Sequence, residues 1–249
     1  MICLLGVDLG TSGTKTVLFD AEGREVASQS VEYPLYQPQN GWAEQDPRDW
    51  WNAAVSTIRG VLEKSGVNPG DVKGLGISGQ MHGLVLLDEN GEPLGRSLLW
   101  CDGRTQRECD EITQAVGEKR LIEIAANPAL TGFTAGKILW VRRHQPELFA
   151  RARHALLPKD YVRYRLTGVL AQEISDASGT NLLDVPARRW SKEIMDKLGL
   201  SLSLLPPLVE SCEAAGANLY DEAGLIANDS PNEEAREACR ELGRKLAAW

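Results

Sequence analysis

The chain has 249 residues, of which 43% are hydrophobic and 25% charged, which is ordinary for a globular protein with one large or two small domains. Its formal net charge of −8 repels phosphate backbones and anionic lipid, so we expect neither nucleic acid nor a membrane as partner. The apolar segment 1–7 is too short to span a bilayer and follows no basic region. We therefore read no targeting signal and expect a cytoplasmic location.

Cysteine usage agrees with a reducing compartment. No C-x-x-C pair occurs, and the number of cysteines is odd, which is typical of reduced thiols. The cysteines are Cys3, Cys101, Cys109, Cys212 and Cys239.

The first third of the chain predicts alternating strands and helices. A helix is expected with Asp46 as its N-cap and Pro47 at its first position, ending before Gly66. Glycine-containing turns separate apolar, β-prone runs on both sides of this helix. The expected strands are 2–9, 14–20, 25–31, a buried strand 72–78, and 84–88. The order strand, helix, strand predicts an α/β layered domain.

The rest of the chain is predicted to be mostly helical. Residues 171–184 read as extended, with a turn at 177–180, and Pro206-Pro207 marks a break. The tail from residue 217 contains a capping box from Ser230 to Glu233 and then an apolar stripe, which predicts a terminal helix. The helices expected before the tail are 105–116, 121–126, 136–144, 158–166 and 190–198.

A carboxylate precedes a glycine-rich turn near the start of the chain. Asp8 ends the first predicted strand, and the turn 10–13 follows it. Glycines let backbone N–H groups approach phosphate oxygens, and a Mg²⁺ between carboxylate and phosphate would make the charges compatible. The alternative is a plain β-hairpin with a glycine turn. Neither the P-loop nor the dinucleotide fingerprint occurs in this segment.

Two further groups of polar residues follow predicted strands. Gln80, Met81 and His82 lie between two glycines at a strand's carboxyl end, where ligands of open α/β sheets bind. Their donors and acceptors suit a polyol, although a loop with a structural histidine is the alternative. Asp102 and Arg104 follow Trp100 and could close a sugar pocket. The alternative there is a helix start, with Asp102 as the cap and Arg104 exposed.

Taken together, these segments resemble the FGGY family of carbohydrate kinases. The opening residues 6–15 resemble the family's phosphate-binding hairpin, which has the same form in actin and hexokinase. The trio at 80–82 resembles the xylulokinase branch, whereas glycerol kinases carry an Arg-Glu pair in that region. The resemblance extends over residues 1–215, and its other segments are 41–47, 132–144, 157–161 and 175–180.

The resemblance implies an actin-like, ribonuclease H-like ATPase fold, with the N-terminal FGGY kinase domain at 1–216. It implies phosphorylation of D-xylulose, or a related sugar, to D-xylulose 5-phosphate, with ATP and Mg²⁺ as cofactors. By carry-over, Asp8 would hold Mg²⁺ through water. The phosphate contacts would be Gly10, Thr11, Ser12, Gly13, Thr14 and Lys15. The sugar contacts would be Gln80, Met81, His82, Trp100 and Asp102.

Part of the family pattern is not found. Family members carry a general-base aspartate in a Gly-Gly-x-Asp motif, whereas this sequence has no Gly-Gly pair and diverges into the tail 217–249 after Glu213. The C-terminal nucleotide domain is also not found. We therefore expect either a truncated kinase of little activity or a sugar-binding or interaction module without catalysis. A separate C-terminal domain or a homo-oligomer could supply the missing half.

Overall fold

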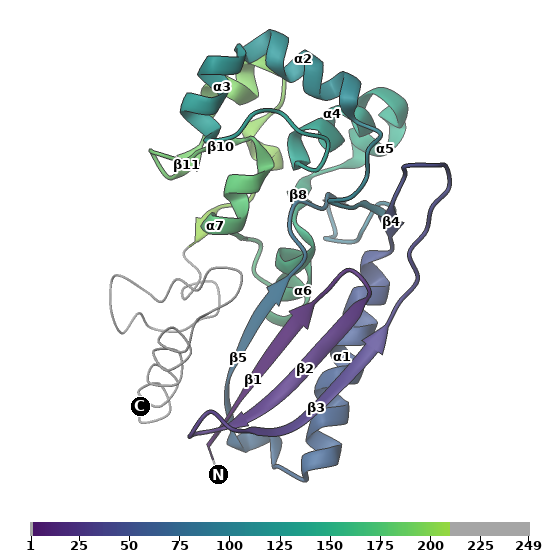
Figure 1. The fold of residues 1–249 in the computed structure, drawn as a ribbon, viewed down its shortest axis with the longest axis vertical. Helices are drawn as coiled ribbons and strands as arrows, with labels where there is room; N and C mark the ends of the chain where they lie inside the picture. The colour runs from purple at the N-terminus through teal and green to yellow at the C-terminus, as the bar shows by residue number, and fades with distance from the viewer. Residues whose placement is uncertain (1, 210–249) are drawn as a thin grey trace. The chain divides into compact units, whose positions relative to one another are not determined.

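The computed structural model describes residues 2–209, and these divide into two compact units (Figure 1). The first unit contains residues 2–32 and 52–79, and the second contains 33–51 and 80–209. Residues 210–249 lie outside the described part of the chain. They include Cys212, Cys239 and the terminal helix that the sequence predicts after Ser230.

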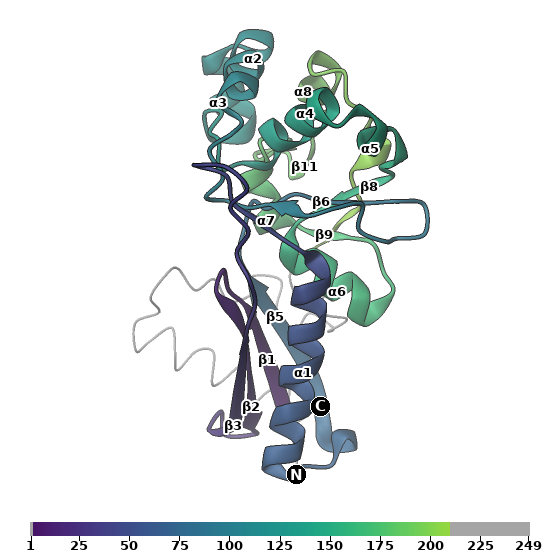
Figure 2. The same ribbon diagram turned by 90° about the vertical axis from the view of Figure 1, so that its right-hand side faces the viewer.

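The first unit is built on a four-stranded sheet with the order β3-β2-β1-β5. β1 pairs antiparallel with β2 and parallel with β5, and helix α1 covers one face of the sheet (Figure 2). The strands expected at 2–9, 14–20, 25–31 and 72–78 are thereby confirmed. The elements are β1 (Cys3–Leu9), β2 (Gly13–Asp20), β3 (Glu25–Glu32), α1 (Pro47–Ser65), η1 (Pro69–Asp71) and β5 (Val72–Gly79).

A small apolar core joins the sheet to α1. Residues of β1 alternate between buried and partly exposed, as expected of a strand with one covered face. Leu5 and Leu18 pack with Val61 of the helix, and the Thr16 hydroxyl donates to the Thr57 hydroxyl at 2.7 Å. The period-2 pattern of the strands and the 3.6-residue pattern of the helix therefore meet on one surface.

The second unit is formed by short strands and helices. The Asp46 carboxylate accepts the Arg48 N–H at 2.9 Å, which confirms Asp46 as the cap of α1. The strands of the second unit pair as β4–β7, β6–β8, β9–β12 and β10–β11. The strands are β4 (Glu44–Gln45), β6 (Val85–Leu87), β7 (Ser97–Leu98), β8 (His154–Leu156), β9 (Gln172–Glu173), β10 (Leu183–Asp184), β11 (Arg189–Trp190) and β12 (Leu208–Val209). The helices are α2 (Gln106–Val116), α3 (Glu118–Ala125), α4 (Thr134–His144), α5 (Pro146–Arg151), α6 (Pro158–Thr167), α7 (Ile174–Ala177), η2 (Ser178–Thr180), α8 (Lys192–Lys197) and η3 (Leu202–Leu204).

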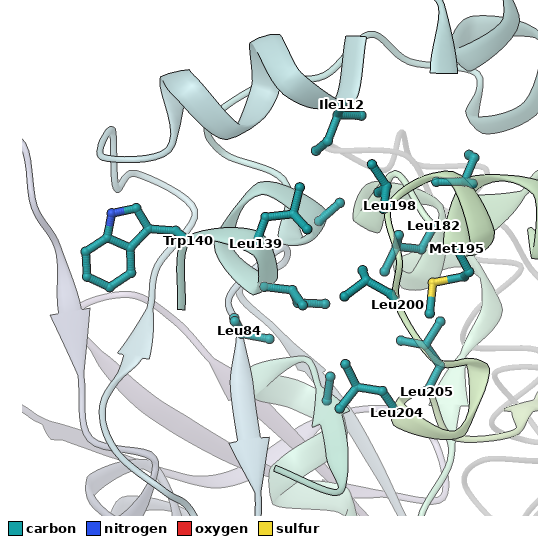
Figure 3. Packing of buried hydrophobic residues seen from close by; sticks show 14 of the residues in the cluster. Leu84, Ile112, Leu139, Trp140, Leu182, Met195, Leu198, Leu200, Leu204 and Leu205 are labelled. Carbon is teal, nitrogen blue, oxygen red and sulfur yellow. The ribbon is translucent and has the colours of Figure 1, made fainter. Parts of the chain in front are cut away.

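One large apolar cluster holds the second unit together. Side chains from α2, α4, α8 and the segment after α8 converge on it (Figure 3), among them Ile112, Leu139, Met195 and Leu200. Each of these four is at most 7% exposed. Burial of this kind contributes about 25 cal/mol per Å² of apolar surface and stabilises the frame that carries the polar loops.

Three sequence-based expectations are wrong in detail. Residues 171–184 are not extended, because α7 and η2 lie between the short strands β9 and β10. The Glu173 carboxylate accepts the N–H groups of Ser175 and Asp176, and such local bonds favour a turn over a strand. The helix at α5 was not expected, and Trp190 belongs to β11 rather than to a helix. β5 is also not buried, since its residues are half-buried or exposed.

Within residues 2–209, no helix has both the length and the apolar character needed to cross a bilayer. Cys3, Cys101 and Cys109 are free thiols, as the sequence predicts.

The core of the first unit yields a stability prediction. Leu18→Ala removes a side chain with 0% exposure and leaves a cavity, so we expect the free energy of unfolding to fall by about 2–5 kcal/mol. The control is Val26→Ala on the adjacent strand, where the side chain is 39% exposed and the expected loss is under about 1 kcal/mol. Urea denaturation measures both. Equal losses in the two variants would contradict the assigned core.

Candidate functional site

Asp8 lies in a polar row on the exposed face of the first unit's sheet. In the strand register Asp8 is directly opposite Lys15 of β2 and Ser78 of β5. All three residues are exposed. A carboxylate next to an ammonium group, open to solvent, is a surface that can receive a charged ligand without disturbing the core.

The turn after Asp8 leaves little room for side chains. The Gly10 N–H donates to the Gly13 carbonyl oxygen at 3.0 Å. A Cβ on Gly13 would lie 2.6 Å from the Val31 carbonyl oxygen, so only glycine fits there. Thr14 is 1% exposed as a whole residue, so the structure does not present it to a ligand, in contrast to its predicted role as a phosphate contact. The glycines at both ends of the turn keep it tight, while Thr11 and Ser12 form its tip.

This arrangement fits a bridging Mg²⁺. The sites of kinases hold Mg²⁺ with one or two carboxylates, water and substrate phosphates rather than with an all-protein cage. Asp8 offers one exposed carboxylate beside a tight glycine turn. Within residues 2–209, no three His, Cys, Asp or Glu side chains converge so that they could hold a metal ion.

The carboxyl ends of two strands lie side by side in the first unit. β1 and β5 are parallel, and their register places Leu9 opposite Gly79. The glycine turn after β1 and the loop after β5 therefore leave the sheet at the same edge, where ligands of α/β sheets bind.

In the second unit, the loop 80–83 is a tight turn centred on His82. The Gly83 N–H donates to the Met81 carbonyl oxygen at 2.8 Å, and His82 has a φ of 64°. A positive φ is strained for a residue other than glycine, and such strain gathers at functional sites. The Met81 side chain is 49% exposed.

The Gln80 side chain is buried and supports the loop by an internal hydrogen bond. Its amide donates to the Gln45 Oε1 at 2.9 Å, and the same oxygen accepts the indole N–H of Trp50 at 3.0 Å. Gln80 is 8% exposed. The structure thus exposes Met81, leaves His82 half-buried, and uses Gln80 to fix the base of the loop.

The His82 ring is held in a neutral state. Its edge meets the Phe133 ring, with centroids 4.8 Å apart and planes at 83°. Burial, together with the nearby Lys137 ammonium, lowers the pKa of His82 to about 4, although an interaction with the Gly179 backbone partly opposes this. A neutral imidazole offers one donor and one acceptor, which suits a hydroxyl group.

Asp102 and Arg104 form a buried ion pair. Their side chains are 0% and 2% exposed. The guanidinium donates to both oxygens of Asp102 at 2.7–3.0 Å and to Glu44 Oε1 at 2.8 Å. The Ala43 N–H donates to Asp102 Oδ2 at 2.6 Å. Asp102 is therefore fully engaged inside the protein.

Aromatic rings complete the enclosure of Arg104. Its Cζ lies 3.6 Å from the Trp42 ring centroid and 4.8 Å from that of Trp140. The alternative of a simple helix start is wrong, because Thr105 is the N-cap of α2 and Arg104 is not exposed. Trp100 is 46% exposed, so the structure does not bury it with this pair.

Sequence reasoning missed two buried charged groups near the loop. The Lys137 ammonium donates to the carbonyl oxygens of Thr131, Gly132 and Phe133. Burial lowers the pKa of Lys137 to about 7, and the Asp102 carboxylate opposes this shift. A lysine within the apolar run 135–141 was the available signal. The second group is the ion pair of Lys159 and Glu173. These two residues are 14 positions apart, so no local sequence pattern indicates that they pair.

Comparison with known proteins identifies the relatives of this chain. Residues 3–227 match the FGGY family of carbohydrate kinases, N-terminal domain. The chain is 44% identical over 216 residues to the xylulose kinase of Bacillus subtilis, an alignment that covers 87% of this chain and 43% of that protein. It is 34% identical over 247 residues to the xylulose kinase of Staphylococcus xylosus, covering 98% and 51%. The chain thus spans about half the length of these curated relatives.

A solved structure shares the fold. The crystal structure of a "xyloylose kinase" from Brucella ovis superposes with a TM-score of 0.79 at 41% identity, covering 84% of this chain and 43% of that one. The α/β architecture is therefore that of FGGY N-terminal domains, with the actin-like ATPase fold expected from the sequence.

The buried ion pair leads to a prediction about stability. Arg104→Met leaves the Asp102 carboxylate buried without its partner, so we expect the free energy of unfolding to fall by about 3–5 kcal/mol. Arg104→Lys should recover only part of this, since an ammonium cannot make the bidentate, stacked contact. Arg107→Met is the control, because that side chain is 70% exposed and the loss should be under about 0.5 kcal/mol. Urea denaturation in which Arg104→Met resembles Arg107→Met would refute the structural role.

Proposed function

Because the chain belongs to the FGGY family of carbohydrate kinases as an N-terminal domain, we propose that it is the sugar- and phosphate-binding part of a kinase for D-xylulose. The observation that carries the proposal is the parallel register of β1 and β5. It brings the turn after Asp8 and Gly79, the last residue of β5, to one edge of the first unit's sheet. Ligands of α/β sheets bind at such an edge, and transfer of a phosphoryl group is mostly a matter of positioning and charge stabilisation.

The sugar is proposed to bind at the loop 80–83 of the second unit. The Nε2 atom of the His82 ring would bond one hydroxyl, since Nδ1 is buried, and the exposed Met81 thioether would pack on the carbon chain. Trp100 offers a further exposed apolar surface. Gln80 and Asp102 act from behind, since both are engaged in internal hydrogen bonds.

The phosphate end is proposed to lie at Asp8 and the turn 10–13. When bound, Mg²⁺ would neutralise charge that develops on the phosphoryl oxygens. Asp8 would hold the ion through water, and the turn 10–13 would contact the transferring phosphate of ATP. The Lys15 ammonium, opposite Asp8 in the register, would limit the repulsion between carboxylate and phosphate.

The remaining parts of a complete kinase are proposed to come from outside these residues. The general base expected in a Gly-Gly-x-Asp motif is not found in the sequence. A base contributes about 10²–10⁴-fold, and closure of a cleft over the nucleotide adds more. A separate C-terminal domain or a second copy of the chain could supply both. A cytoplasmic location stays a prediction from composition.

We expect weak sugar binding without turnover. A few exposed hydrogen bonds of about 0.5–1.5 kcal/mol each give at best millimolar affinity for D-xylulose. Without a base near the attacking hydroxyl, ADP release should not depend on sugar. Titration calorimetry measures the first and a coupled ADP assay the second.

The control for binding is His82→Ala, which should abolish the sugar-dependent heat. Glucitol and glycerol serve as comparison polyols. Sugar-dependent ADP release at an ordinary kinase rate, about 1–100 per second, would show that these residues hold a complete active site. Absence of any sugar binding in the unaltered chain would remove the proposed role of the loop.

Asp8→Asn tests the phosphate end. We expect about 10- to 100-fold weaker binding of Mg-ATP, because a charge-assisted contact of about 1.5–3 kcal/mol is lost, with little change in stability. Glu63→Gln, an exposed carboxylate of α1, is the matched control and should change neither. Calorimetry and thermal melting give the two quantities. A lower melting temperature with unchanged Mg-ATP affinity would mean that Asp8 is structural.

A further inference from the structure

The His82 ring fills the space beside Gly179. A Cβ on Gly179 would lie 2.1 Å from His82 Cε1 and 2.2 Å from Nδ1, far inside any real contact distance. The ring therefore occupies the space that any side chain at 179 would need. Phe133 meets the same ring edge-on, with centroids 4.8 Å apart.

A buried ionic network anchors the segment that carries Gly179. η2 follows α7, whose N-cap is Glu173, and the Glu173 carboxylate accepts the N–H groups of Ser175 at 2.7 Å and Asp176 at 3.0 Å. The Lys159 ammonium lies 3.1 Å from both Glu173 and Asp176. Burial opposes ionisation of Glu173, but Lys159 and these hydrogen bonds lower its pKa to about 2. The backbone leading to Gly179 is thus held by charges that do not depend on sugar.

The segment that carries Phe133 is anchored in the same way. Lys137 is 0% exposed, and its ammonium group binds the carbonyl oxygens of residues 131–133. The Thr134 hydroxyl donates to the His82 carbonyl oxygen at 3.1 Å, which ties the same segment to the loop backbone. Both the ring and the main chain of His82 are therefore held by this segment.

We propose that Gly179 and Phe133 are positioning residues, which hold the imidazole of His82 in one orientation before any sugar arrives. The inference rests on the proposed function only for the statement that this orientation serves sugar binding. We call these two residues the clamp. A side chain fixed in advance loses less conformational entropy when it binds a ligand, so the clamp increases affinity without touching the ligand. It also selects among polyols, since a ring with one orientation matches one arrangement of hydroxyl groups.

The test uses histidine NMR, because the chain has only three histidines. Imidazole signals are followed between pH 5 and 8 in the unaltered chain and in Gly179→Ala, with His82 assigned by its loss in His82→Gln. In the unaltered chain, His82 should not titrate in this range, since its pKa is about 4. In Gly179→Ala, the ring must leave its place, so His82 should now titrate between pH 5 and 8 and D-xylulose affinity should fall tenfold or more.

Matched controls separate the clamp from general damage. In Gly95→Ala the new Cβ has Leu148 Cδ1 as its nearest atom, at 3.5 Å, an ordinary contact, so the titration of His82 should not change. The signals of His144 and His154 report whether the second unit stays folded. If Gly179→Ala does not fold, Phe133→Leu removes the other side of the clamp without a clash and should also raise the midpoint.

The outcomes are distinct. An unchanged His82 titration in folded Gly179→Ala, or in Phe133→Leu, overturns the clamp. A raised midpoint with unchanged D-xylulose affinity would support the clamp but contradict its role in sugar binding. If the unaltered chain binds no sugar while the midpoint still rises, the proposed function fails and the clamp on His82 stands.

Discussion

The burial of Arg104 is the constraint on which the second unit's site depends. A guanidinium that is 2% exposed needs partners for its charge and its N–H groups, because an unpaired buried charge costs several kcal/mol. Asp102 and Glu44 supply the charge, and Trp42 and Trp140 cover its faces. These partners come from the loop before α1, the turn after β7 and helix α4. One cation therefore fixes three segments that the apolar core alone would leave free to shift.

Two buried lysines near the His82 loop are likewise surrounded by partners for their charge. Lys137 satisfies three carbonyl oxygens at the start of α4, and Lys159 pairs with the carboxylates that cap α7. None of these charges is exposed enough to be an ordinary surface group. They stiffen irregular backbone that has no ladder of hydrogen bonds of its own. A sugar site built on such backbone can be precise although it lies on loops.

The first unit is held together by apolar packing between its sheet and α1. Its sheet and α1 form a regular apolar layer, and the polar row of Lys15, Asp8 and Ser78 lies on the exposed face. The tight turn at Gly10–Gly13 follows from sterics, since a Cβ on Gly13 would meet the neighbouring strand. Asp8, Lys15 and Ser78 are exposed, whereas Gly13 is fixed by the neighbouring strand.

Local pattern in the sequence was enough to predict the regular parts of the molecule. The strands β1, β2 and β3, the cap at Asp46 and the helices α2, α4 and α6 follow from periodicity and turn residues, which act over a few neighbours. The motifs at Asp8 and at 80–82 also stood out, because their glycines are local signals. The structure alone decided that Asp102 and Arg104 are internal, that 171–184 bends into α7 and η2, and that Gly179 lies against His82. The first and the last depend on partners from other segments, up to about a hundred residues apart, and no local pattern encodes a contact that only folding brings together. The bend depends on the Glu173 carboxylate, whose local bonds compete with an extended reading of the same residues.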